Sequence, residues 1–351
     1  MKRALVCNYL PPQYVTIVRA SQAANNFCER LMEIRIFDEI YSILPISYKI
    51  PINTKSDSVT FFINGKRNII SKSFRYISLN FKAALSLRKK EIIWFYNITP
   101  SFLLTYILIK FLFKKKTYII MADYTNPSKR ISLQSIIGHL IRKSDGIISL
   151  SARSCFDHHN MLIKAGIISE TMLNKENYTP ANKNITFLFS GLLSDITGYD
   201  MALKIFARIP KAQLYISGNG EYPQEYKKYS NIHYMGNLPY NKYLDLLDNV
   251  TICLNFRNPY KTENNNNFPS KILDYFSRGK IVISTIKYPE IQGANYFYTE
   301  YNENLLENLI RDIMQMDPLE LKQYQSNKDF LKRNFSLKAW HKAINIIEKT
   351  C

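Results

Sequence analysis

The feature that most constrains the fold is a series of four apolar runs in the second half of the chain. They span 185–191, 212–218, 232–236 and 250–256, and the stretches between them have room for helices. Strands that alternate with helices build a parallel sheet covered on both faces. Ligands of such sheets bind beyond the carboxyl ends of the strands. The first three runs end there in glycines that we expect to contact the ligand, namely Gly191, Gly218 and Gly236.

The segment 268–285 indicates a loop, a short helix and a buried strand. Ser270, Lys271 and Ile272 fall where the helix begins, and free backbone N–H groups at such a position suit a phosphate. Asp274 follows one turn later, where it can accept hydrogen bonds from sugar hydroxyls. Together they form a site that holds a nucleotide by its pyrophosphate and its ribose. The alternative is an ordinary surface loop followed by an amphipathic helix.

This segment resembles the donor-site motif of nucleotide-sugar glycosyltransferases that have two Rossmann-like domains, the GT-B fold. It is most similar to the family 4 type and its bacterial polysaccharide relatives, and the resemblance covers 181–335 well. The second acidic residue of their Glu-x7-Glu pair usually binds the ribose; here it is Asp274, and the first falls at Asn266. Relatives often carry a basic residue after the first glycine, which this chain lacks. We therefore expect Lys271 and Arg257 to meet the phosphate charge, although Arg257 has an equal claim to be an exposed loop residue.

The resemblance implies an α/β architecture with two Rossmann-like parallel-sheet domains facing a cleft. A chain of 351 residues suits two domains. We expect a basic, membrane-facing acceptor domain over 1–180 and a donor domain over 181–335. The final segment 336–351 is expected to be a helix that crosses back to pack on the first domain. The linker is expected around 174–184, which is poor in apolar residues.

The activity implied is transfer of a sugar from a nucleoside diphosphate sugar to a glycan or lipid-linked acceptor, with retention of configuration, in bacterial surface polysaccharide synthesis such as that of O-antigen and lipopolysaccharide. The base is expected near the backbone of Gly236 and Asn237. Positive charge and the helix dipole would stabilise the leaving diphosphate. We expect no cofactor and no metal, because the chain has no Asp-x-Asp motif.

Asp123 is the acceptor-side candidate. It follows the predicted strand 117–121, so it lies at a strand end where it can bind or activate an acceptor hydroxyl. A turn or helix-capping aspartate is at least as common at such a position. Two further expectations concern polar residues. The Asn-rich stretch 261–267 is expected to be a solvated insertion or a flap over the donor, and His158 and His159 are expected on the polar face of a helix.

Positive charge is concentrated in the first half of the chain. Residues 1–180 carry 26 Lys/Arg and 11 Asp/Glu, whereas residues 181–351 carry 21 and 17. This asymmetry favours an anionic membrane surface as partner. Nucleic acid is not expected, because no zinc-finger spacing, RNP-like strand or Arg-rich helix is present. We therefore expect a cytoplasmic protein held on the inner face of the plasma membrane.

Several other classes are disfavoured. The five cysteines show no paired or metal-like spacing, which is typical of reduced core thiols. The apolar run 102–113 is too short to span a bilayer and is predicted to be a buried helix. The first loop lacks Gly-x-Gly-x-x-Gly, which argues against a dehydrogenase or epimerase. Two alternatives stay open: a catalytically inactive scaffold of the same fold, and a nucleotide-sugar epimerase.

Overall fold

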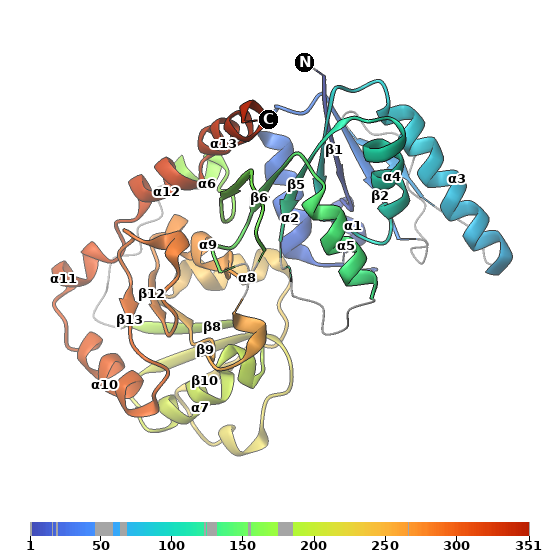
Figure 1. The fold of residues 1–351 in the computed structure, drawn as a ribbon. Helices are drawn as coiled ribbons and strands as arrows, with labels where there is room; N and C mark the ends of the chain where they lie inside the picture. The colour runs from blue at the N-terminus through green and yellow to red at the C-terminus, as the bar shows by residue number, and fades with distance from the viewer. Residues whose placement is uncertain are drawn as a thin grey trace. The chain divides into compact units, whose positions relative to one another are not determined.

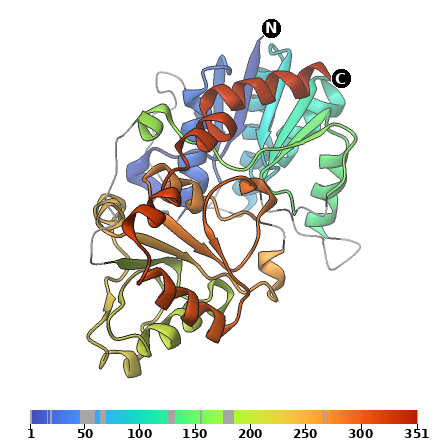
Figure 2. The ribbon, with the colours of Figure 1, turned by 90° about the vertical axis from the view of Figure 1, so that its left-hand side faces the viewer.

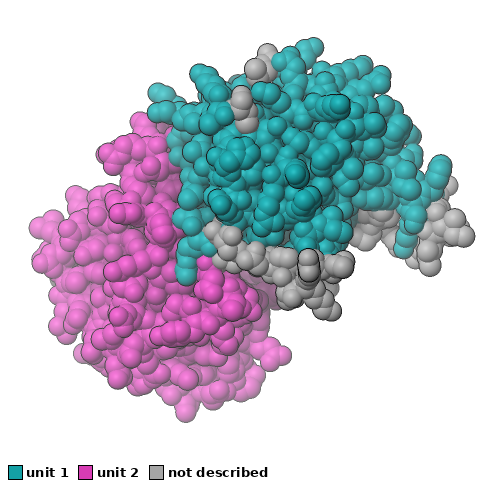
Figure 3. Space-filling view, in the orientation of Figure 1, with its two compact units in different colours: residues 1–169, 337–351 teal, residues 170–336 magenta. Residues whose placement is uncertain are grey.

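The structure is a computed structural model of the chain. It describes residues 2–15, 17–18, 20–45, 59–63, 69–122, 124, 132–153, 156–174, 185–265 and 267–350, and no side chains for 69–71. The chain divides into two compact units, shown in different colours in Figure 3. Unit 1 is Met1–Ser169 with Leu337–Cys351, and unit 2 is Glu170–Ser336. Most of the expected linker, 175–184, lies outside the described residues.

Unit 1 contains a seven-stranded sheet in the order β3-β2-β1-β4-β5-β6-β7. All of its strand pairs are parallel. The strands are β1 Arg3–Cys7, β2 Glu39–Ile43, β3 Val59–Phe62, β4 Ile92–Tyr96, β5 Lys116–Met121, β6 Gly146–Ser149 and β7 Met161–Ile163. The helices are α1 Pro12–Val15, α2 Gln22–Glu33, α3 Ile69–Leu87, α4 Leu103–Ile107 with its π-helical continuation η1 Leu108–Leu112, α5 Leu133–Arg142 and α13 Leu337–Lys349.

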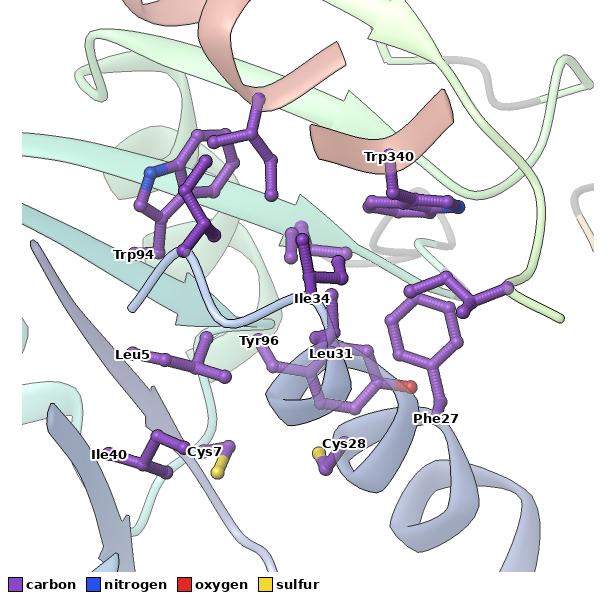
Figure 4. Packing of buried hydrophobic residues seen from close by; sticks show 14 of the residues in the cluster. Leu5, Cys7, Phe27, Cys28, Leu31, Ile34, Ile40, Trp94, Tyr96 and Trp340 are labelled. Atoms are coloured by element: carbon purple, nitrogen blue, oxygen red, sulfur yellow. The ribbon is translucent and has the colours of Figure 1, made fainter. Parts of the chain in front are cut away.

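Alternate residues of the buried strands point to opposite faces of this sheet. Both faces are apolar, and helices cover each of them. Leu5 and Cys7 of β1 lie in the cluster that includes α2 and α13, part of which is drawn in Figure 4. Ala4 and Val6 lie in the cluster on the other face, which includes side chains of α3, α4 and α5. The apolar run 102–113 is helical, as the sequence predicts, with a π-helical second half; Phe102, Tyr106 and Ile109 are buried, whereas Phe111 and Leu112 are exposed.

The C-terminal helix α13 returns to unit 1, which confirms the expected crossing (Figures 1 and 2). Trp340 is fully buried, and its Nε1 donates to the carbonyl oxygen of Gly166 at 2.6 Å. Near the end of the helix, the buried carboxylate of Glu348 accepts hydrogen bonds from Arg3 Nη2 at 2.6 Å and from Trp94 Nε1 at 2.8 Å. A buried carboxylate is stable only when it is paired in this way, so these bonds fix the end of α13 on the sheet.

Unit 2 contains a six-stranded parallel sheet in the order β10-β9-β8-β11-β12-β13. The strands are β8 Thr186–Leu192, β9 Gln213–Asn219, β10 Ile232–Tyr234, β11 Ile252–Asn255, β12 Ile281–Ser284 and β13 Phe297–Tyr298. The α-helices are α6 Glu170–Asn174, α7 Tyr199–Ala207, α8 Tyr240–Asn249, α9 Lys271–Ser277, α10 Glu303–Ile313, α11 Pro318–Gln323 and α12 Lys328–Phe335. The 3₁₀-helices are η2 Asp195–Thr197, η3 Gln224–Tyr226, η4 Thr262–Asn264 and η5 Pro289–Ile291.

Both sheets follow the doubly wound order, in which the chain builds outward from one central strand and then reverses direction from it. The predicted α/β class with two Rossmann-like domains is confirmed. In unit 2 the reversal lies between β8 and β11, and in unit 1 it lies between β1 and β4. Ligands of such sheets bind at the carboxyl end of this switch point. None of the described helices is both long enough and apolar enough to cross a membrane.

One local prediction is wrong. His158 and His159 lie in a loop rather than on the polar face of a helix, and their rings stack with centroids 4.3 Å apart. The two ring nitrogens of His158 lie 3.1 Å from the carbonyl oxygen of Asn160 and 3.2 Å from that of Ser144. The side chain therefore satisfies loop carbonyl groups, a use that helical spacing does not reveal.

Candidate functional site

Glycines shape the carboxyl edge of the unit 2 sheet. Gly191 at the end of β8 has a φ of +118° and pairs with Gly218 of β9. A Cβ atom on Gly218 would lie 1.7 Å from the carbonyl oxygen of Gly191, so no other residue fits without moving the strands apart. Gly236, with a φ of +68°, accepts a hydrogen bond from Gly218 N at 3.0 Å. A Cβ atom there would meet nothing within 4 Å, so the chain beyond β10 borders open space.

Lys271 is the first residue of α9 and reaches back to the end of β8. Its Nζ donates to the carbonyl oxygen of Ser190 and lies 5.9 Å from the centre of the Phe189 ring. A Cβ atom on Gly191 would lie only 3.2 Å from this nitrogen. Burial of the ammonium group, and then repulsion by Arg257, lower the pKa of Lys271 to about 7. Lys271 therefore lies at the switch point, and near neutral pH its amine is partly unprotonated and can take up a proton.

Arg257 follows β11, and the structure gives it a role that neither sequence interpretation foresaw. Its Nη1 donates to Asn264 Oδ1 at 2.8 Å and to Asn267 Oδ1 at 3.0 Å. Asn264 is fully buried, and its Nδ2 donates to the carbonyl oxygens of Ile196 at 2.7 Å and Asn258 at 2.8 Å. At Asn264 the Asn-rich stretch is therefore a buried support for Arg257, and the prediction of a solvated insertion is wrong there.

Among the described residues, the side-chain hydrogen bonds of the two cations go to amide and carbonyl oxygens and not to carboxylates. In the part of the chain that the structure describes, the titratable neighbours that shift the pKa of Lys271 are Arg257 and the thiol of the buried Cys253, and neither is a carboxylate. The positive charges of Lys271 and Arg257 come from different elements and repel each other, at a cost that a bound anion would relieve. The arrangement can therefore bind a phosphate or diphosphate.

The start of α9 is less open to a ligand than the sequence predicts. The backbone N–H of Ile272 donates to the carbonyl oxygen of Pro269 at 3.0 Å. The backbone N–H of Leu273 donates to the carbonyl oxygen of Ser270, also at 3.0 Å. The expected free N–H at Ile272 is thus already bonded, and its role in donor binding stays a prediction. The side chain of Ser270 is exposed and forms no capping hydrogen bond. Side-chain charge therefore dominates this end of the site.

Behind Lys271 lies a polar network that sequence reasoning missed. The hydroxyl of Ser190 lies 2.7 Å from the Tyr275 hydroxyl and 3.4 Å from that of Tyr243. Burial raises the pKa of Tyr243, the hydrogen bond with Ser190 lowers it, and the nearby Cys253 and Asp274 raise it. Asp274 is thus a partly buried group close to this network. No pattern in the apolar runs distinguishes Ser190 from an ordinary strand serine.

The remaining predicted site residues are less defined. Asn237 is exposed beside Gly236. Asp123 and Asn266 lie outside the described residues, so their predicted roles stay predictions. In the part of the chain that the structure describes, no group of three or more His, Cys, Asp and Glu side chains is placed to hold a metal ion.

Comparisons with known proteins agree with this fold. No family model matches the chain, and no curated protein does. Among solved structures, Anabaena HepE in complex with UDP and glucose is 14% identical over 100% of both chains, with a TM-score of 0.69. The lipopolysaccharide outer core galactosyltransferase WaaB in its apo form is 14% identical over 98% of this chain and 99% of its own, with a TM-score of 0.62.

A third similar structure differs in what it holds. An α-glucosyltransferase in complex with UDP and a DNA 13-mer is 10% identical over 99% of this chain and 100% of its own, with a TM-score of 0.65. At these identities the likeness establishes the fold. The chain has the GT-B fold, and its solved structural neighbours include several glycosyltransferases.

Proposed function

We propose that this protein is a glycosyltransferase that moves a sugar from a nucleoside diphosphate sugar to an acceptor. The observation that carries the proposal is the ammonium group of Lys271 at the glycine edge, close enough to Arg257 for the two positive charges to repel each other. A diphosphate leaving group is the anion such a site would stabilise, because its charge develops as the bond to the sugar breaks. UDP in two of the three neighbouring structures supports a nucleotide donor.

The donor would lie along the carboxyl edge of unit 2. Its diphosphate would contact Lys271 and Arg257 beside Gly191, and its ribose hydroxyls would bond to Asp274. Its base would lie over the backbone of Gly236 and Asn237, where the structure leaves space. We propose that the two cations do this work without a metal ion or cofactor, and that the sugar is transferred with retention of configuration.

On the acceptor side we propose a glycan or lipid-linked sugar of bacterial surface polysaccharide synthesis, with Asp123 contacting the acceptor hydroxyl. The protein would act in the cytoplasm as a peripheral protein on the inner face of the plasma membrane. The basic first half of the chain and the likeness to WaaB, a lipopolysaccharide transferase, support this choice. The neighbour bound to DNA makes nucleic acid the acceptor to test against it.

A thermal-shift screen of UDP-, GDP-, ADP- and CMP-linked ligands tests the donor site. We expect one nucleoside diphosphate and its sugar to raise the melting temperature, and the matching donor to be hydrolysed slowly or used when an acceptor is supplied. Protection without any turnover would support the inactive scaffold. Interconversion of the free donor sugar without acceptor would support the epimerase. The absence of protection by every nucleotide would overturn the donor site.

A further inference from the structure

Helix α3 of unit 1 exposes a stripe of large apolar side chains. Phe74, Ile77 and Phe81 have 74%, 55% and 44% of their surface exposed. Their spacing of three and four residues places them on one side of the helix. We call these three residues the α3 stripe. In Figure 1 α3 is the outlying helix of unit 1.

The stripe is not a misplaced core face, because α3 is already firmly packed at Asn80, about a quarter turn round the helix from the stripe. Asn80 is fully buried, and its Oδ1 accepts hydrogen bonds from the backbone N–H of Thr105 at 3.0 Å and from Thr105 Oγ1 at 2.7 Å. Its Nδ2 donates to the carbonyl oxygens of Ser101 at 3.1 Å and Tyr76 at 3.0 Å. All the bonding capacity of this buried amide is used, so α3 is held in one orientation with its stripe outward.

Positive charge adjoins the stripe. Lys82 is exposed next to Phe81 on α3, and Lys89 is exposed two residues beyond the end of the helix at Leu87. The segment 69–144 contains fourteen Lys and Arg residues but only two acidic ones. The π-helix η1 packs against α3 and exposes Phe111 and Leu112 as well. Exposed aromatic and aliphatic groups beside lysines are typical of helices that lie in a membrane interface.

We infer that the α3 stripe docks on an anionic lipid bilayer. Phe74, Ile77 and Phe81 would enter the boundary between headgroups and acyl chains, while Lys82 and Lys89 would bind lipid phosphates. The inference rests on the proposed function, because docking on the membrane would bring the enzyme to a membrane-held acceptor. A second copy of the chain fits poorly, because a two-fold contact would bring equal positive patches together. Nucleic acid would use the lysines but would leave Ile77 without a partner.

Flotation of the full-length protein with phosphatidylcholine vesicles, with and without phosphatidylglycerol, tests this inference. We expect binding to the anionic vesicles alone. The triple variant Phe74→Ser, Ile77→Ser, Phe81→Ser should reduce the partition coefficient roughly tenfold or more, because the apolar contacts with the membrane are lost. Lys82→Gln with Lys89→Gln should reduce it about 25-fold, at roughly fivefold per lysine, and added salt should weaken wild-type binding.

A matched control keeps net charge equal. Lys227→Gln with Lys228→Gln removes two exposed lysines from unit 2 and should leave vesicle binding unchanged. The inference would be overturned if the control variant lost as much vesicle binding as the Lys82 and Lys89 variant. It would also be overturned if the wild type did not bind, or if the triple variant bound as well as the wild type. Retention of the wild type on DNA but not on anionic vesicles would overturn it too, as would a dimer that only the triple variant dissociates. Protection by nucleotide, measured on the same samples, shows separately whether the donor site holds.

Discussion

The two sheets share a strand order, but their carboxyl edges at the switch point are built differently. In unit 2 the last residue but one of the central strand β8 is Gly191, which pairs with Gly218, and the ammonium group of Lys271 lies beside Gly191. In unit 1 the central strand β1 ends with the buried Cys7, and the next residue, Asn8, donates to the carbonyl oxygen of Ile43 on β2. Cys7 and Cys28 also lie in one buried cluster, as Figure 4 shows.

The shared strand order and the side chains at the strand ends make different contributions to these edges. The order alone creates an edge with a gap in each unit. In unit 1 side chains of the strand ends bond across that edge, whereas in unit 2 glycines leave the backbone accessible and cations adjoin it. A diphosphate can approach the backbone only where no Cβ atom intervenes. The comparison therefore favours unit 2 for the donor site of the proposed function, and the following changes test that proposal.

The largest effect is expected from Gly218→Ala. The new Cβ would lie 1.7 Å from the carbonyl oxygen of Gly191, so β8 and β9 must separate at the site. We expect the free energy of unfolding, measured in urea, to fall by about 3 kcal/mol or more. Gly236→Ala is the matched control: it meets open space and suffers only from its positive φ, so it should cost about 1–2 kcal/mol. Equal losses in the two variants would show that the close contact at Gly218 is unimportant.

Two buried lysines of the same region provide the second test. Lys280 Nζ donates to the carbonyl oxygens of Asp248 and Val250, each at 2.8 Å, whereas the Lys271 ammonium adjoins the glycine edge. Lys271→Met should weaken binding of UDP, or of the nucleotide found by screening, about 100-fold in calorimetry. Lys280→Met should lower stability by about 2 kcal/mol and leave affinity unchanged. A Lys271 variant with normal affinity would remove the phosphate site from this edge.

The third test uses pH. Because the pKa of Lys271 is lowered to about 7, the ligand-free lysine is mostly neutral above that pH. A bound diphosphate favours its charged form, so binding takes up a proton and affinity should fall about 50-fold between pH 7 and pH 9. Calorimetry in buffers of different ionisation enthalpy measures this uptake directly. Lys271→Met should abolish it, and a pH-independent wild type would contradict the role of Lys271.

The same lysine affects the ligand-free protein in the opposite direction. The unfolded chain keeps the proton on Lys271 up to about pH 10.4, whereas the folded chain loses it near 7. Between these values the unfolded state binds more protons, so the free energy of unfolding should rise with pH. Urea unfolding of the wild type and of Lys271→Met, compared across this range, isolates the contribution of the single residue.

Much of this architecture could be predicted from the sequence, because strand runs and helical spacings are local signals. The parallel sheets and the helix at 102–113 follow from such patterns, whereas the return of α13 follows from the family resemblance. The support of Arg257 by Asn264 could not, because it depends on two loops meeting in space. The contacts of Ser190 with Tyr243 and Tyr275 escaped for the same reason, since they join residues more than fifty positions apart.

The smallest effect is expected from Asp274→Ala, which addresses the sugar end of the nucleotide. If the carboxylate accepts ribose hydrogen bonds, its loss should weaken UDP binding about tenfold while inorganic pyrophosphate binds as before. Asp245→Ala, which removes a carboxylate with 69% of its side chain exposed on α8, controls for the change in charge. Equal weakening of UDP and pyrophosphate would mean that Asp274 acts on the whole site electrostatically. That result would leave Lys271 as a phosphate ligand and the ribose without an assigned partner, so the two halves of the donor are tested separately.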